Sequence, residues 1–150
     1  MTLIKTTALL STLLLTPLAA QAETLAGPAA LELRFEGIKT SSGRILAVLA
    51  GSEAAFADRP TETGANRPLV VEVSGDAART VVTGLQPGRY AVRAFHDLNG
   101  DGKLATNPFG IPTEPFAFSN NAPAAMGPAK WADAAFEVGP NGAVHTIIID

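Results

Sequence analysis

Hydrophobic and polar residues alternate along several short segments of this chain, a pattern typical of half-buried β-strands. The clearest case is LELRFEGI at 31–38, where leucine and phenylalanine alternate with glutamate and arginine. RILAVLAG at 44–51 has no polar face after its first residue and predicts a strand buried on both sides. The turn-forming SSG at 41–43 lies between them. We therefore expect these two strands to form a hairpin.

Further strands are predicted along the rest of the chain, within 68–75, 78–85, 85–97, 130–139 and 143–150. Turn signals separate them at Gly75-Asp76, Pro87-Gly88 and Asn141-Gly142. A short helical turn is expected after Ser52, a candidate N-cap. The pattern predicts an all-β fold, a single antiparallel β-sandwich of about seven strands, immunoglobulin- or transthyretin-like.

The stretch from Pro108 to about Ala129 has no hydrophobic period and is rich in Pro, Gly and Asn. Such a long loop in a compact domain is usually functional or held down by its own side chains. Its apolar residues, with the tryptophan that follows, either line a binding patch or pin the loop to the sheet; they are Phe109, Phe116, Phe118, Met126 and Trp131. The sequence favours pinning.

The N-terminal residues 1–22 have the pattern of a secretory signal peptide: one basic residue, an apolar stretch and a small-x-small cleavage site before Glu23. Residues 23–150 then form one domain, expected in the periplasm or outside the cell. The chain contains no cysteine, which excludes disulfides and attachment of a lipid to cysteine.

The formal net charge of −3, without a basic cluster, argues against nucleic acid and against anionic membrane surfaces. No membrane insertion is expected once the signal is removed. The partner is expected to be an envelope protein or a small ligand, whose identity the sequence leaves open together with the oligomeric state.

The segment HDLNGDGKLATN, residues 96–107, carries the candidate chemistry. It follows the first half of a calcium-loop pattern, with ligands expected from the Asp97, Asn99 and Asp101 side chains and the Lys103 carbonyl. The second half is missing, because Ala105 and Pro108 occupy the later ligand positions. A Ca²⁺ site would need further oxygens from Asn107, Glu114 or Asp133. The alternative is a metal-free turn, since Asn and Asp cap their own backbone.

No catalytic residue or organic cofactor is expected, because the chain lacks a nucleophile motif, a zinc-type cluster and a phosphate-binding glycine loop. We expect a non-catalytic binding or accessory domain. Two alternatives stay open: a small hydrolase or lyase using His96 and Glu114, and a structural or assembly subunit with exposed strand edges. The expected loop supports are His96, Asn107, Glu114, Ser119 and Asn120.

Three motifs follow one another in the second half of the chain. The first, L-x-P-G-x-Y, is matched by Leu85, Pro87, Gly88 and Tyr90. The second, H-D-x-N-x-[ND]-G-K-L-D-T-N, is matched by His96, Asp97, Asn99, Gly102, Lys103, Leu104, Thr106 and Asn107. The third, G-I-P-x-E-x-x-x-F-S-N-N with a later G-P, is matched by Gly110, Ile111, Pro112, Glu114, Phe118, Ser119, Asn120, Asn121, Gly127 and Pro128.

With these motifs the chain resembles DUF2141, a family of secreted bacterial proteins, and its first motif is also similar to prealbumin-like and Cna-B-type sandwiches. The resemblance implies an exported β-rich domain and no particular activity. Ala105 stands where the family has aspartate, which implies a weaker cation site.

Overall fold

The computed structural model describes residues 28–58 and 65–150, so the expected signal peptide at 1–22 lies outside the described residues. The strands are β1 (Ala29–Glu36), β2 (Arg44–Ala50), β3 (Asn66–Ser74), β4 (Ala77–Leu85), β5 (Gly88–Asp97), β6 (Phe116–Phe118), β7 (Phe136–Val138) and β8 (Ala143–Ile148). Three short helices accompany them, α1 (Glu53–Phe56), η1 (Ser119–Asn121) and α2 (Trp131–Ala134). None of the helices in the described residues could span a membrane.

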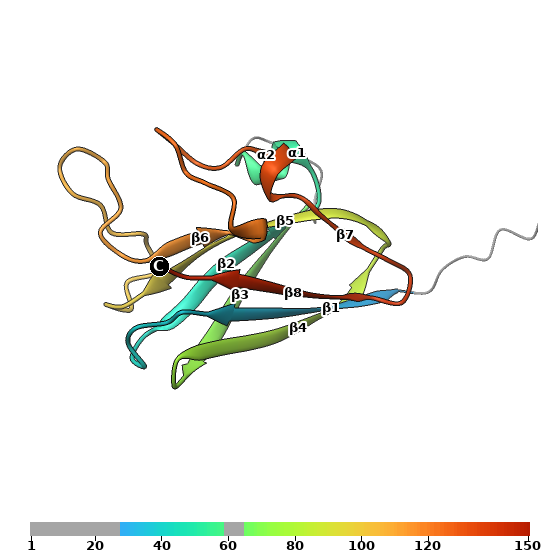
Figure 1. The fold of residues 1–150 in the computed structure, drawn as a ribbon, viewed down its shortest axis with the longest axis horizontal. Coiled ribbons are helices and arrows are strands. Elements are labelled where there is room, and N and C mark those ends of the chain that lie inside the picture. The colour runs from blue at the N-terminus through green and yellow to red at the C-terminus, as the bar shows by residue number, and fades with distance from the viewer. Residues whose placement is uncertain (1–27, 59–64) are drawn as a thin grey trace, which may run out of the picture.

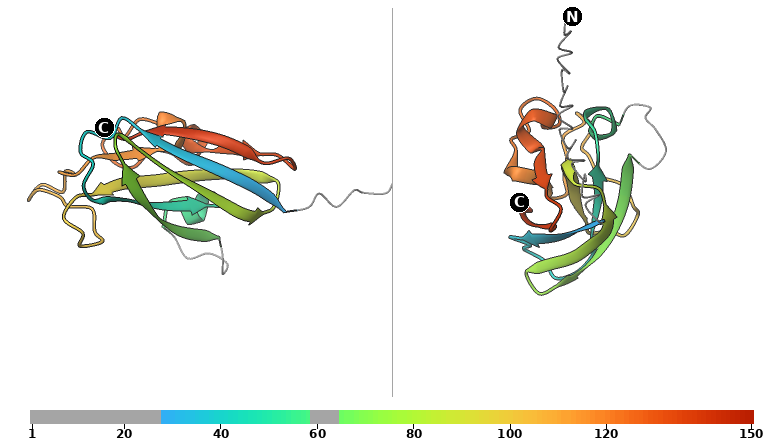
Figure 2. Two further views of the ribbon diagram at one scale, coloured as in Figure 1. Left: turned by 90° about the horizontal axis from the view of Figure 1, so that it is seen from below. Right: turned by 90° about the vertical axis from the view of Figure 1, so that its right-hand side faces the viewer.

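The strands form one continuous sheet in the order β6-β5-β2-β3-β4-β1-β8, with β7 also paired to β5 (Figure 1). All pairs are antiparallel except β1 with β8. The predicted all-β class is confirmed, with eight strands in place of about seven. The sheet curls around its interior, so that it resembles a nearly closed barrel more than two separate layers (Figure 2).

The predicted hairpin of the first two strands is wrong. β1 pairs with β4 and β8, whereas β2 pairs with β3 and β5. The turn residues before Gly43 reverse the chain as expected, but they carry it from one part of the curled sheet to another. The predicted turn at Asn141-Gly142 does form, closed by the Gly142 N–H, which donates to the Gly139 carbonyl at 3.0 Å. The strands beyond it separate, because β7 pairs with β5 and β8 pairs with β1. Turn chemistry specifies a reversal locally, and the burial of the flanking strands selects their partners.

The interior of the curled sheet is filled by the apolar positions of the alternating strands. Leu31, Leu33 and Phe35 of β1 are 0 % exposed, as are Ile45 of β2 and Ile147 of β8. Full burial of such side chains contributes about 1.5–3 kcal/mol each. This core confirms the faces predicted from alternation.

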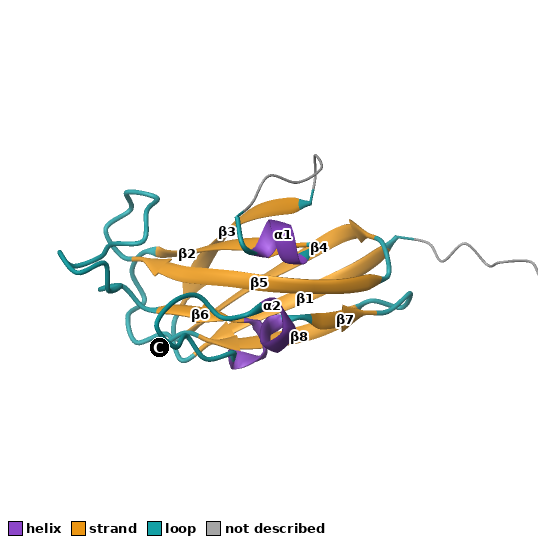
Figure 3. Ribbon diagram, turned by 90° about the horizontal axis from the view of Figure 1, so that it is seen from above, coloured by secondary structure: helices purple, strands orange, loops and turns teal. Residues whose placement is uncertain are grey.

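A second apolar cluster covers the outer face of β5, beneath α1 and α2, which lie on either side of this strand in Figure 3. Phe116, Phe118, Phe56 and Trp131 form a row of edge-to-face contacts, with successive ring centroids 6.0 Å apart. The Ser52 hydroxyl accepts the Ala55 N–H at 3.2 Å, which confirms the predicted N-cap.

The segment 108–139 departs from the prediction in two places. Strand β6 and helix η1 lie within the stretch expected to be irregular, and residues 131–134 form α2 where a strand was expected. The Ala135 N–H donates to the Trp131 carbonyl at 2.8 Å to close this turn. Alanine favours helix over strand, so a short alternating pattern filled with alanine does not specify a strand.

The aromatic residues divide between the two roles considered for them. Phe116, Phe118 and Trp131 pin the segment to the sheet, as predicted. Phe109 and Met126 do not, because their side chains are 88 % and 107 % exposed at loop tips. The predicted pinning therefore holds for the strand and helix of this segment and fails at its two tips.

Candidate functional site

The polar loop connects β5 to β6 and begins at Asp97, the last residue of β5, whose side chain is fully buried. Its Oδ1 accepts the Gly100 N–H at 2.8 Å, and its Oδ2 accepts the Gly102 N–H at 3.2 Å. The Arg44 guanidinium of β2 lies 3.4 Å from Oδ2 and also donates to the Gly100 carbonyl. The buried charge is thus paired and hydrogen-bonded, which a carboxylate requires in this position.

Glu114, just before β6, closes the loop from the other side. Its carboxylate is buried, with Oε1 accepting the Leu98 N–H at 2.9 Å and Oε2 the Ala105 N–H at 2.9 Å. The Thr113 N–H donates to the Ala105 carbonyl at 2.8 Å. One side chain therefore holds both ends of the Asp97 turn. We name Asp97, Arg44 and Glu114 with the turn between them the carboxylate clasp.

The remaining predicted calcium ligands lie on the exposed side of the turn. Asn99 Oδ1 accepts the Asp101 N–H at 3.0 Å, and Asp101 Oδ1 accepts the Lys103 N–H at 2.8 Å. Within 28–58 and 65–150, no three or more His, Cys, Asp or Glu side chains are grouped so that they could hold a metal ion. The side-chain oxygens of Asp97, Asn99 and Asp101 that were expected to bind Ca²⁺ accept backbone N–H groups, as in an Asx-turn.

Beyond the clasp, the chain forms a narrow projecting tip. The Asn107 Oδ1 accepts two N–H groups, from Phe109 at 2.9 Å and from Ile111 at 3.0 Å. Thr106 and Pro112 form a β-bridge across its base. The side chains at the end face solvent, since Phe109 is 88 % and Ile111 58 % exposed. The Asn107 side chain therefore caps the base of an apolar tip.

His96 supports the same region from inside the sheet. Its ring is buried, and Nε2 lies 2.7 Å from the Ser42 carbonyl oxygen. Because a carbonyl only accepts, Nε2 must carry the proton in this contact. The His96 backbone N–H donates to the Pro115 carbonyl at 2.8 Å. This histidine links the β1–β2 turn to the β5–β6 loop.

Ser119 and Asn120 support a different loop, the one between β6 and β7. The buried Ser119 hydroxyl accepts the Val92 N–H at 2.8 Å and donates to the Ala134 carbonyl at 2.6 Å. The Asn120 amide donates to the carbonyls of Asp133 at 3.0 Å and Ala135 at 3.1 Å. The five predicted supports therefore divide into three at the carboxylate clasp and its tip and two at α2.

A contact that sequence reasoning missed joins η1 to β8. The Asn120 N–H donates to His145 Nε2 at 3.1 Å, and the imidazole stacks on the Phe136 ring at 3.9 Å between centroids. Burial lowers the pKa of His145 from its ordinary value of 6.5. Since a backbone N–H can only donate, this contact requires the neutral ring. The available signal was its inward position in the alternation of β8, between Ala143 and Ile147.

We expect the stability of the protein to fall as the pH drops below about 6.5, the ordinary histidine pKa, because the folded state binds a proton at His145 more weakly than the unfolded chain. Above that pH the contribution of the neutral His145 ring to stability is fully present. His145→Gln keeps an acceptor and does not titrate, so its free energy of unfolding should depend less on pH. Urea titrations between pH 5 and 8 measure both slopes, and equal slopes would contradict this role.

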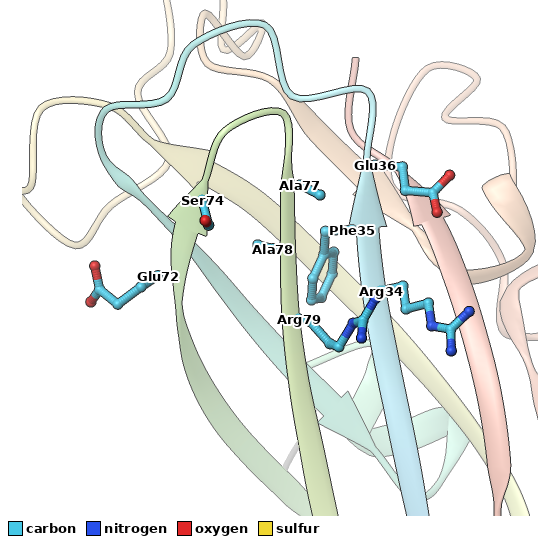
Figure 4. A pocket seen from close by; sticks show the side chains of 8 residues that line it. All are labelled: Arg34, Phe35, Glu36, Glu72, Ser74, Ala77, Ala78 and Arg79. Atoms are coloured by element: carbon cyan, nitrogen blue, oxygen red, sulfur yellow. The ribbon is translucent and has the colours of Figure 1, made fainter.

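Two grooves of the described surface lie away from the carboxylate clasp. One of about 390 Å³ lies where β3 and β4 diverge, and the other, also about 390 Å³, lies beside β6. Neither is lined by His96, Asp97 or Glu114. In the first, Glu72 points away on the β3 side, whereas Arg34 and Glu36 point outward over β1 (Figure 4). Its polar groups therefore do not converge on one ligand.

These features define a class: an all-β domain with a buried carboxylate clasp that holds a projecting loop. The family comparison is more specific, because residues 33–146 match DUF2141, described as an uncharacterized protein conserved in bacteria. The chain belongs to this family, as its motifs indicated. Neither the curated proteins nor the solved structures contained a match.

Proposed function

We propose that this protein is a non-catalytic binding domain that presents the tip around Phe109 and Ile111 to a partner. The observation that carries the proposal is the combination of a rigidly held loop with apolar side chains at its end. Glu114 accepts the Leu98 and Ala105 N–H groups at 2.9 Å each, and the exposed fraction of Phe109 is 88 %.

The hydrogen bonds that hold the tip in place favour a binding role over that of a simple connection between β5 and β6. The exposed phenylalanine and isoleucine side chains leave apolar surface in water. Covering this surface with a partner would contribute about 25 cal/mol of binding free energy for each Å² buried. The loop is uncharged from Leu104 to Thr113, so the partner is expected to offer an apolar, uncharged recess. A loop fixed before binding loses little conformational entropy on association.

The hydrolase or lyase alternative has less support. The polar end of His96 is directed at the Ser42 carbonyl, and both Glu114 oxygens accept backbone N–H groups. A general acid or base needs an accessible polar atom facing a bound substrate. The assembly-subunit alternative draws support from unpaired strand edges of the curled sheet.

Export to the periplasm or to the outside of the cell is part of this proposal and rests on the pattern of residues 1–22. In that setting the partner is an envelope protein or a small ligand. Calcium bracing at Asp97, Asn99, Asp101 and Lys103 is the alternative to a metal-free clasp. The Arg44 cation, 3.4 Å from Asp97 Oδ2, supports the metal-free form because it already neutralises the buried carboxylate.

We also propose that the fold derives from a two-layer sandwich of the immunoglobulin or transthyretin type. The support is the β3–β4 connection, which pairs only Val73 with Ala78 and Ser74 with Ala77 before the strands diverge. A corner of this kind joins two layers in orthogonal sandwiches.

Site-specific photocrosslinking in cells that produce the protein tests the function. A photoreactive phenylalanine at position 109 is expected to give one adduct, and the same group at Val70, which is 62 % exposed on β3, is expected to give none. An excess of wild-type domain should remove the adduct, and the double variant Phe109→Ser, Ile111→Ser should not. Equal competition by both proteins would refute the role of the tip.

A further inference from the structure

Among the strands of residues 28–58 and 65–150, several edges have no backbone partner, and those of β3 and β4 carry features that hinder pairing with another strand. Pro68 lies on β3, where its missing N–H removes an edge donor. Across the opening between β3 and β4, Arg67 donates to the Thr83 carbonyl at 3.0 Å and to the Gly84 carbonyl at 3.2 Å. These edges are protected against pairing with another strand.

The edges of β7 and β8 are similarly occupied. On β8, the Ile148 N–H donates to the Asn121 side chain at 2.9 Å. On β7, Glu137 places a charge in the middle of the strand, 3.5 Å from Arg89. Charged residues and side-chain caps are devices that keep foreign strands away.

Strand β6 differs, because its outer edge carries neither a charge nor a proline. The His96 N–H donates to the Pro115 carbonyl at 2.8 Å, so this pair is a hydrogen-bonded one. Hydrogen-bonded and non-hydrogen-bonded pairs alternate along an antiparallel ladder. It follows that Ala117 bonds to β5, whereas Phe116 and Phe118 direct their N–H and C=O groups away from it.

A groove of about 390 Å³, lined mostly by residues with apolar side chains, runs beside this open edge. Its walls are β6 itself, Asn121 of η1 with residues 122–124 after it, Ile148 at the end of β8, and Asp150 beyond that strand. Figure 1 shows the last residue next to β6. Asp150 is the one charged residue among the described residues that line the groove. The groove therefore combines free backbone groups, apolar walls and a single negative charge.

We propose that this groove binds one extended strand of a partner chain, which pairs with β6, places apolar side chains in the groove and carries a lysine or arginine opposite Asp150. Pairing of this kind takes affinity from main-chain hydrogen bonds and specificity from alternate side chains. A second copy of this chain fits less well, because it brings the same net charge of −3 and the same Asp150. The surface is separate from the Phe109 tip and needs no part of it.

The probe is a labelled peptide of alternating valine and threonine with one terminal lysine, and binding is followed by fluorescence anisotropy. We expect saturable binding that weakens at least about tenfold when alternate amides of the peptide are N-methylated, because those N–H groups make the strand pairing. Replacing the lysine by glutamate should also weaken binding, and Asp150→Asn should remove that difference. Equal binding of the methylated peptide would overturn the proposal.

Variants of β6 supply the matched test on the protein. Both Phe116→Val and Phe116→Pro remove the aromatic ring, and Phe116→Pro also removes an N–H that points away from β5. Phe116→Val should keep peptide binding within about threefold, whereas Phe116→Pro should weaken it at least about tenfold. Thermal melts check that both variants fold. If either does not, the binding of the methylated peptide to the wild type still tests whether the peptide pairs with β6. If the wild type formed a dimer and Phe116→Pro dissociated it, the groove would be occupied by a second copy of this chain. That result would overturn the proposal of a strand from a different partner.

Discussion

Replacing Gly43 with alanine is expected to destabilise the protein by about 3 kcal/mol or more. Gly43 has a φ of +80°, where an L-residue is strained by about 1–2 kcal/mol. A β-carbon at this position would also lie 2.4 Å from the Asp97 carbonyl oxygen, so the backbone of the carboxylate clasp would have to move. Urea unfolding followed by circular dichroism measures the loss.

Gly75→Ala is the matched control for this substitution. Its φ of +69° is similarly strained, but a β-carbon there would meet nothing within 4 Å. We expect Gly75→Ala to lower the free energy of unfolding by about 1–2 kcal/mol, from the strained backbone conformation alone. If the two variants lost the same stability, the close approach of Gly43 to Asp97 would have no energetic importance.

Asp97→Asn is expected to lower the free energy of unfolding by about 2–4 kcal/mol. The change preserves shape but turns one acceptor into a donor, so either the Gly100 or the Gly102 N–H faces an NH₂ group. It also leaves Arg44 without its counter-charge. Chemical denaturation of wild type and variant gives the difference.

Asp101→Asn serves as the control, because this side chain lies on the exposed side of the same turn, and it should change stability by less than about 1 kcal/mol. Thermal melts with millimolar CaCl₂ and with EDTA distinguish the calcium-braced form of the loop from the metal-free form. We expect no difference in Tm for the wild type. A rise that needs calcium and disappears in Asp97→Asn would establish the metal-braced form, since binding to the folded state must raise its stability.

The candidate site could be predicted in part from its local chemistry. The run from His96 to Asn107 has glycines and Asx residues at the spacing of a tight turn, and the structure contains such a turn, capped by Asp97 and Asn99. The bonds of Glu114 could not be predicted in the same way. It reaches Leu98 from sixteen positions away, and that contact exists only after the chain has folded back to form β6. A local sequence pattern does not predict which distant carboxylate accepts the backbone N–H groups of such a loop.

The apolar tip was visible in the sequence as Phe109 and Ile111 in an uncharged stretch, but whether these side chains are buried was not. The same segment contains Phe116 and Phe118, which pack in one cluster with Phe56 of α1 and Trp131 of α2. Aromatic residues of one segment thus differ in exposure, since some are packed against the sheet and others face solvent. Contacts from distant elements such as Phe56, 6.0 Å from Phe118 between ring centroids, decide which of them is exposed.

By itself, the sequence determined most of the strands, most of their inward faces, the turns between them and the family, because alternation, glycine and proline act over a few neighbouring residues. Only the tertiary structure decided that β1 pairs with β4 and β8 rather than with β2, and that β6 exists with an open edge. An alternating pattern states which side of a strand is buried and does not state which strand lies beside it. Partner choice depends on how all apolar faces are buried together, and that condition belongs to the whole chain.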